Sequence, residues 1–278
     1  MSFYKLLASD LDGTLLNTQG EISRENLAAI KTLHDMGVSL VPATGRAYSE
    51  IPTPLKESPY IRYIIYSSGA AVYDKLTGKK MCSLGMAHDL ASRLLSILEK
   101  YDTHVTVRYE GVSYIDEAQT GDEDFEHYNM FLPHRRVLRQ YGQQKRTLMQ
   151  WSHTLDEIEM LCVFFSHDDE MAACKKQLAA LDGITCAEIA PYSIEIVSSR
   201  AGKGEALTTL AQKTGTPIAE TVGIGDSTND LSLIKTAGVG IAVANAAPAI
   251  KAVSDVVICS CDDHAIAYIA DMIKRKAL

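Results

Sequence analysis

The sequence predicts an α/β protein, in which a doubly wound parallel sheet forms the core and an α+β unit is inserted into that core. Strand-like and helix-like segments alternate in residues 1–85 and again in residues 198–278. This alternation is typical of a parallel sheet that helices cover on both faces. Residues 86–197 contain hairpin patterns and amphipathic helices instead, which indicates a separate inserted domain.

Hydrophobic periodicity and turn residues set the elements before residue 85. Ser23 is expected to cap a helix that ends at Gly37, because apolar residues follow Ser23 at helical spacing. Pro52 and Pro54 break any helix that begins after Arg46. Apolar runs and hairpin patterns predict the strands of this part, at residues 4–9, 38–42, 63–66, 72–73 and 80–81.

The same alternation returns after residue 198. Gly215 and Pro217 end a helix that is expected from residue 204. A strand at residues 220–224 leaves Asp226 just past its end. The remaining elements expected here are helices at residues 231–236 and 264–276 and strands at residues 239–243 and 256–259.

The middle of the chain is expected to form its own small sheet with helices. An antiparallel strand pair is predicted around Glu110-Gly111, whose glycine suits a tight turn. No pattern assigns residues 140–151. The expected elements are helices at residues 90–101 and 170–181 and strands at residues 105–109, 112–115, 160–166, 184–189 and 193–197.

Bulk composition narrows the functional classes. With 46% hydrophobic residues the chain can build folded cores, and its net charge of -8 argues against nonspecific nucleic-acid binding. No apolar run approaches the ~20 residues that cross a bilayer, and the N-terminus runs directly into the first strand, so we expect no membrane partner, no signal peptide and a cytoplasmic location. None of the six cysteines forms a Cys-x-x-Cys pair, and the expected cytosolic context predicts reduced, mostly buried thiols.

The residues that carry chemistry begin right after the first expected strand, in Asp10-Leu11-Asp12-Gly13-Thr14-Leu15. Open α/β sheets bind their ligands beyond the carboxyl ends of the strands. Asp10 is suited there to act as a nucleophile and Asp12 to transfer protons, and both are oxygen ligands suited to Mg²⁺. Asp and Gly are also ordinary turn residues, so this motif alone also fits a turn without a catalytic role.

Three further segments follow in order: Ala43-Thr44-Gly45-Arg46, Gly202-Lys203-Gly204 and Gly225-Asp226-Ser227-Thr228-Asn229-Asp230. With the first motif, they resemble the four motifs of the haloacid dehalogenase superfamily, and their intervals resemble its Cof-like phosphatase branch. The resemblance implies a Rossmann-like core at residues 1–85 and 198–278 and an inserted cap domain at residues 86–197. It also implies a Mg²⁺-dependent phosphatase that acts on small phosphorylated metabolites, such as sugar phosphates, through an aspartyl-phosphate intermediate.

The same resemblance assigns roles to individual residues. Catalysis falls to Asp10, Asp12, Thr44 and Lys203. The metal ligands implied are Asp10, Asp226 and the backbone carbonyl of Asp12, with Asp230 supporting Asp226 or Lys203. The residues expected to contact phosphate or substrate are Leu11, Thr44, Gly45, Arg46, Ser68, Lys203 and Asn229.

Some positions depart from the family pattern or also fit a role without a substrate contact. The family usually has Asn where this chain has Ser68 and Ser227, which puts inherited contacts to the leaving group in doubt. Arg46 suits either a substrate contact or a solvated charge. His127 and His134 follow a run of acidic residues, and a solvated polar face is favoured there over a substrate contact.

Two other functions fit the same motifs. A phosphomutase or phosphotransferase of this superfamily would keep Asp10 and Asp12 but exclude water from the intermediate. A catalytically silent regulator that binds a phosphorylated metabolite is disfavoured, because the acids and Lys203 are intact. Dinucleotide-binding and P-loop functions lack their glycine motifs in this sequence.

Overall fold

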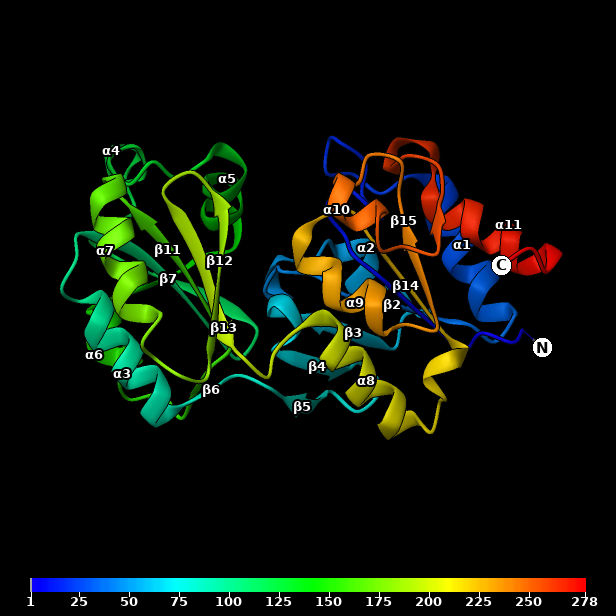
Figure 1. Ribbon diagram of the computed structural model, residues 1–278, viewed down its shortest axis with the longest axis horizontal. Helices are drawn as coiled ribbons and strands as arrows, with labels where there is room; N and C mark the ends of the chain where they lie inside the picture. Colours follow the sequence, from blue (N-terminus) through cyan, green and yellow to red (C-terminus); the bar gives the residue numbers. More distant parts are fainter. Residues whose placement is uncertain (1) are drawn as a thin grey trace. The chain divides into compact units, whose positions relative to one another are not determined.

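The computed structural model describes residues 2–278, and the chain folds into two compact units (Figure 1). The core unit contains the chain up to Gly45, Pro52–Ser83 and Gly202–Leu278. The insert unit contains Leu84–Ala201 and also the short segment Arg46–Ile51. The chain therefore passes between the units at four places, where the sequence had led us to expect two.

The main sheet of the core unit is parallel, with the strand order β16-β15-β14-β1-β2. Helix α1 packs against α11, and α8 packs against α9; Figure 1 shows the two pairs on different sides of the sheet. The strands are β1 (Leu6–Ser9), β2 (Ser39–Pro42), β14 (Thr221–Gly225), β15 (Val239–Ala242) and β16 (Val256–Val257). The helices are α1 (Arg24–Asp35), α8 (Lys203–Thr214), α9 (Leu231–Thr236), α10 (Pro248–Lys251) and α11 (Ala265–Arg275).

Burial on both faces explains why β1 is apolar without alternation. All of its residues are buried, and Leu6 and Ala8 belong to the cluster that contains Leu207 and Leu210 of α8. The predicted cap of α1 is confirmed, since the Ser23 side chain accepts a hydrogen bond from the Asn26 backbone N–H. The α/β class with a doubly wound parallel core is confirmed by this architecture.

A second, antiparallel sheet in the core unit contains β3 (Tyr63–Tyr66), β4 (Ala71–Asp74) and β5 (Lys79–Ser83). It adjoins the main sheet through a bridge between Ala43 and Ile65. The predicted hairpin is thus present. The short helix α2 (Thr53–Lys56) begins at the prolines instead of being broken by them, because Pro54 lies in its first turn, where no backbone N–H is needed.

The insert unit is built on a mixed sheet with the order β12-β13-β11-β7-β8-β9. Its central strand β11 is buried on both faces. Leu161, Val163 and Phe165 pack in the cluster that includes α3 and α7, whereas Cys162 and Phe164 pack beneath α4 and α5.

The bounds of the insert elements match the expected strands closely and add helices that the sequence did not indicate. The strands are β6 (Met86–Ala87), β7 (Thr103–Tyr109), β8 (Val112–Asp116), β9 (Gln143–Lys145), β10 (Glu157–Ile158), β11 (Met160–Phe165), β12 (Ile184–Ala190) and β13 (Ser193–Ser198). The helices are α3 (His88–Leu98), α4 (Asp122–His127), α5 (Leu132–Tyr141), α6 (Leu148–Ser152) and α7 (Asp168–Leu178). The unassigned residues 140–151 hold the end of α5, β9 and most of α6.

Within residues 2–278, no helix combines the length and the apolar character that crossing a bilayer requires.

Two histidines of the insert unit are buried against the same aromatic ring. His104 on β7 and His134 on α5 both lie against Phe164 of β11, with ring centroids 6.3 Å and 4.7 Å away. Burial lowers the pKa of His134 to about 3, helped by the charge of Arg108, and burial lowers the pKa of His104 to about 4. Both rings are therefore neutral in the folded protein near neutral pH.

We predict that His134→Phe makes unfolding of the insert unit less dependent on pH. Because the folded pKa lies below the unfolded value of ~6.5, the unfolded chain takes up the proton first, and stability is lost as the pH falls from ~6.5 towards 3. Between pH 7 and pH 5, the free energy of unfolding of the variant should therefore fall by about 2 kcal/mol less than that of the wild type. Urea unfolding followed by the fluorescence of Trp151, the sole tryptophan, measures this. An equal pH slope in the variant would contradict the burial of a neutral ring.

Candidate active site

The first motif forms a tight turn directly after β1. The backbone N–H of Asp10 donates to Ile224 O on the neighbouring strand (3.0 Å), so Asp10 still follows the direction of the sheet. The carbonyl of Leu11 accepts from the N–H groups of Thr14 (3.3 Å) and Leu16 (2.8 Å), which closes the turn. Asp10 is buried, whereas Asp12 is exposed. The two carboxylates therefore sit in different environments, as different chemical roles require.

Gly13 brings this turn into close contact with the fourth motif. Its φ is +78°, and a Cβ there would lie 2.4 Å from Oδ2 of Asp226. Its carbonyl accepts a hydrogen bond from Nδ2 of Asn245 (2.7 Å), while Oδ1 of Asn245 accepts the N–H of Cys261 (2.9 Å). Sequence reasoning missed Asn245; the signal available was a lone polar amide just past the strand that precedes it.

Lys203 connects three segments that are far apart in the sequence. It is the first residue of α8 and its side chain is fully buried. Its Nζ donates to Oδ1 of Asp10 (2.6 Å) and to Oδ1 of Asp230 (2.6 Å). Burial disfavours the ammonium charge, but the two carboxylates outweigh burial and hold the pKa of Lys203 above its ordinary value. Lys203 is therefore a fixed positive charge beside Asp10.

Asp226 and Asp230 follow β14 and differ in what their oxygens contact. Oδ2 of Asp230 accepts the backbone N–H groups of Asp226 (3.0 Å) and Ser227 (3.1 Å), and its Oδ1 accepts from Lys203. Burial and the charge of Asp230 raise the pKa of Asp226 to about 6. Both carboxylate oxygens of Asp230 are thus engaged by hydrogen bonds within the protein.

The three acids form a group able to bind a cation. Asp10, Asp226 and Asp230 each offer a carboxylate oxygen, and these oxygens lie within 4.8 Å of one another. Oδ2 of Asp10 and Oδ1 of Asp226 are buried and have no hydrogen-bond partner among residues 2–278. Buried carboxylate oxygens without partners are costly unless a cation or another donor meets them. Their position and chemistry therefore fit a small divalent cation that prefers oxygen.

The second motif and the Ser67–Gly69 turn adjoin this cluster within the core unit. The backbone N–H of Thr44 donates to Ile65 O (3.0 Å), and that of Ser68 donates to Thr44 O (3.0 Å). Ser67 and Ser68 both have a left-handed backbone, with φ of 49° and 53°, which is strained for serine. A Cβ on Gly69 would lie 2.1 Å from Gly202 O, so the turn packs directly on the start of α8.

Three predicted residues lie at or beyond the edge of this cluster. Asn229 is exposed, and its Oδ1 accepts from Ser227 Oγ (2.8 Å) and, at 3.5 Å, from Lys203 Nζ. Arg46 belongs to the insert unit, although Thr44 and Gly45 belong to the core unit. Gly45 is thus the last core residue before the chain enters the insert unit.

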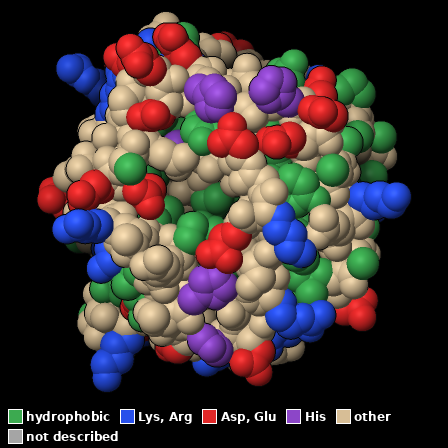
Figure 2. Space-filling model, turned by 90° about the vertical axis from the view of Figure 1, so that its left-hand side faces the viewer, with side chains coloured by type: hydrophobic (Ala, Val, Ile, Leu, Met, Phe, Trp, Pro, Cys, Tyr) green, Lys and Arg blue, Asp and Glu red, His purple; other side chains and the backbone are tan. Residues whose placement is uncertain are grey.

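The histidines singled out from the sequence lie in the insert unit. His127 Nε2 lies 2.8 Å from Oδ2 of Asp102, and both side chains are about half exposed. His134 is buried, so the expectation of a solvated face there is wrong, because α5 packs its residue on Phe164. Figure 2 shows histidine side chains next to acidic side chains on the surface.

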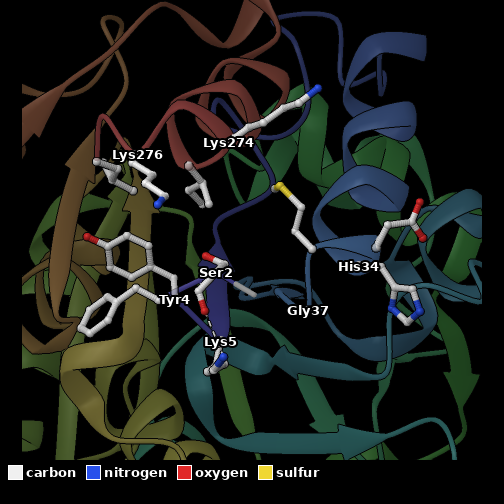
Figure 3. A pocket seen from close by; sticks show the side chains of 12 residues that line it. Ser2, Tyr4, Lys5, His34, Gly37, Lys274 and Lys276 are labelled. Atoms are coloured by element: carbon white, nitrogen blue, oxygen red, sulfur yellow. Dashed lines mark hydrogen bonds between the residues drawn. The ribbon is translucent and has the colours of Figure 1, made fainter.

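A separate pocket of about 890 Å³ lies at the other edge of the core sheet (Figure 3). It is lined by residues that precede β1, by the turn after α1 and by the end of α11, and these include Tyr4, Lys5, His34 and Lys276. Parallel α/β sheets bind substrates at the carboxyl ends of their strands, and this pocket lies before β1 and β2. It contains none of the predicted site residues.

Comparison with known proteins agrees with the fold. A family model described as haloacid dehalogenase-like hydrolase matches residues 7–269. The phosphatase YwpJ of Bacillus subtilis is 30% identical over 285 residues, covering 95% of this chain and 98% of that protein. The B. subtilis 5-amino-6-(5-phospho-D-ribitylamino)uracil phosphatase YwtE is also 30% identical, covering 97% of this chain and 98% of its own. A crystal structure of a haloacid dehalogenase-like hydrolase from Bacteroides thetaiotaomicron superposes with a TM-score of 0.82 at 23% identity, covering 97% of this chain and 99% of that one.

A parallel α/β core with paired acids and a buried lysine at the carboxyl ends of its strands thus defines a hydrolase of the phosphatase class. The chain belongs to the haloacid dehalogenase-like hydrolases, in the Cof-like branch, and is a phosphoric monoester hydrolase. The resemblance read from the four motifs is confirmed.

We predict that Gly13→Ala disables the site, whereas Gly20→Ala does not. Both glycines have a φ of +78°, so each substitution should cost about 1 kcal/mol of stability through the backbone alone. Only at Gly13 does the new Cβ meet Asp226, since nothing lies within 4 Å of a Cβ on Gly20. Phosphate release should fall at least about 100-fold in Gly13→Ala and change less than about twofold in Gly20→Ala. Equal activity in the two variants would contradict the close contact between the motifs.

Proposed function

We propose that this protein is a Mg²⁺-dependent phosphatase that hydrolyses phosphomonoesters of small metabolites, such as sugar phosphates, through an aspartyl-phosphate on Asp10. The observation that carries the proposal is the buried contact of Lys203 with Asp10 and Asp230, beside the two unpartnered oxygens of Asp10 and Asp226. A nucleophile, a fixed positive charge and a cation site thus converge at the carboxyl end of β1.

The residues that would hold the metal are Asp10, Asp226 and the backbone carbonyl of Asp12. Mg²⁺ suits such a site because it keeps several waters and takes few protein ligands. When bound, the ion would neutralise charge on the phosphoryl oxygens and help to orient the phosphate. Asp230 would support this set without joining it, because both of its oxygens already accept hydrogen bonds from the protein.

The steps at phosphorus would belong to the two carboxylates of the first motif. Asp10 attacks phosphorus, a new carboxylate O–P bond forms, and the ester P–O bond breaks. The departing oxygen takes a proton from Asp12, which releases the alcohol. Asp12 then takes a proton from a water molecule that attacks the phosphorus of the acyl phosphate, and this restores the Asp10 carboxylate and releases inorganic phosphate.

The remaining residues would stabilise charge and hold the phosphate. Lys203 lies 2.6 Å from Asp10, where positive charge favours both the ionised nucleophile and the transferred group. Thr44, which is buried at the end of β2, would contact phosphate with its hydroxyl group. The further phosphate or substrate contacts proposed are Leu11, Gly45, Arg46, Ser68 and Asn229.

The substrate would be selected by the insert unit acting as a cap. The catalytic residues proposed here all lie in the core unit. The relatives are named for different phosphorylated compounds, including a phosphoribitylaminouracil, pyridoxal phosphate and HMP-PP. A panel of such compounds and sugar phosphates, with released phosphate as the readout, tests both activity and specificity. We propose a cytoplasmic location, where the six cysteines, all free in the described chain, would stay reduced.

Asp10→Asn is expected to abolish turnover while the fold survives, because an amide is a poor nucleophile. Asp12→Asn should be severely impaired and should accumulate phosphoenzyme with activated substrates if breakdown of the intermediate suffers more than its formation. Phosphate release and mass spectrometry of the intact protein measure the two effects. Near-normal turnover by Asp10→Asn would refute the assignment of the nucleophile.

Activity should require Mg²⁺ and be inhibited by Ca²⁺. Calcium takes more ligands in a looser shell, which would displace Asp10 from its position relative to phosphorus. The assay is phosphate release after exhaustive chelation, followed by addition of each ion. Full activity without any divalent ion would exclude the proposed metal site.

A further inference from the structure

Glu50 is a buried charge in the segment Arg46–Ile51, and the contacts of its carboxylate lie within the insert unit. Its side chain is fully buried. Ser113 Oγ donates to Oε1 (2.6 Å), and the guanidinium of Arg108 lies 3.3 Å from Oε2. Oε2 also accepts the backbone N–H of Ala47 (2.8 Å), which folds the segment into a compact turn. Since Arg108 and Ser113 lie on β7 and β8, the carboxylate binds the segment to the insert sheet.

The backbone of the segment joins the same sheet. The N–H of Ser49 donates to Gly111 O (2.9 Å) at the turn between β7 and β8. The N–H of Gly111 in turn donates to both carboxylate oxygens of Glu159, each at 3.2 Å, and Glu159 is buried as well. The segment is therefore held to this turn by one backbone hydrogen bond and to the strands by one buried carboxylate.

Arg46 is the first residue of this segment and shares its attachment. Nη1 of Arg46 donates to the carbonyl of Glu50 (3.1 Å), and the arginine is partly buried. The residues just before it are held by the core unit instead, since Thr44 bonds to Ile65 and to Ser68. The first stretch of the core unit thus ends at Gly45 and the insert unit begins at Arg46, inside the second motif.

We propose that Glu50 is a positioning residue that holds Arg46 on the insert sheet, so that the proposed contact of Arg46 with substrate depends on the Glu50 carboxylate. The inference rests on the proposed function, in which the second motif binds the phosphorylated substrate. Its consequence is that the position of Arg46 is set, through the Glu50 carboxylate, by Arg108 on β7 and Ser113 on β8.

A double-mutant cycle between Glu50 and Arg46 tests the coupling, with p-nitrophenyl phosphate as the probe. Because Glu50 acts through Arg46, we expect Glu50→Gln to lower kcat/KM about tenfold, Arg46→Ala about 100-fold, and the double variant no further than Arg46→Ala alone. Tyr128→Phe is the control: it removes the hydrogen bonds that the Tyr128 hydroxyl makes with Asp102 (2.7 Å) and Gln119 (2.9 Å) in the insert unit. It does not touch the segment, so it should keep kcat/KM within about twofold. Multiplicative losses in the double variant would overturn the proposal.

Hydrogen exchange gives a readout that does not depend on activity. Ser113→Ala removes one hydrogen bond to Glu50 but leaves its contact with Arg108, so this variant should fold even if Glu50→Gln does not. In Ser113→Ala the amides of Ala47 and Ser49 should exchange faster, while those of Thr44 and Ser68 keep their protection. Faster exchange at all four amides, or at none, would overturn the proposal. Loss of phosphatase activity in the wild type would instead refute the proposed function, and the exchange result would still decide whether the segment belongs to the insert.

Discussion

The buried ammonium group of Lys203 is the contact on which the site depends. It joins the end of β1, through Asp10, to the loop after β14, through Asp230, and it begins helix α8. A buried charge of this kind is stable only while its partners stay in place, because an unpaired ion in a dry environment is very costly. The three segments are therefore held in one geometry by the same charges that the proposed chemistry would use.

Parallel strand order explains why residues so far apart in sequence can meet there. Strands β14, β1 and β2 are neighbours and run in the same direction, so the residues that follow them emerge at one edge of the sheet. Asp226, Asp10 and Thr44 occupy those positions. The ends of these strands place the backbone of the site. Close packing places the Ser67–Gly69 turn, which lies against the start of α8 and leaves no room for a side chain at Gly69.

The sequence pattern was enough to predict the helices and strands that are stabilised by residues close to one another in the chain. Ser23 caps its helix, and the apolar run before Asp10 is a strand buried on both faces. The acids of the site were predictable because each follows such a strand. Asn245, the burial of His134 and helices α4 and α5 were not predictable in this way. Each depends on a partner distant in sequence, such as Cys261 for Asn245 and Phe164 for His134, and one sequence carries no periodic signal for such pairs.

The segment Arg46–Ile51 is another case in which the sequence did not predict a contact between residues far apart in the chain. Pro52 and Pro54, which follow this segment, indicate only that no long helix begins after Arg46. It packs in the insert unit through the buried carboxylate of Glu50 and a backbone hydrogen bond of Ser49, whose partners lie more than 50 residues later in the chain. Domain bounds drawn from the sequence assume that all residues between two bounds belong to the same domain. Here six residues of the insert unit, Arg46–Ile51, lie between two stretches of the core unit in the sequence.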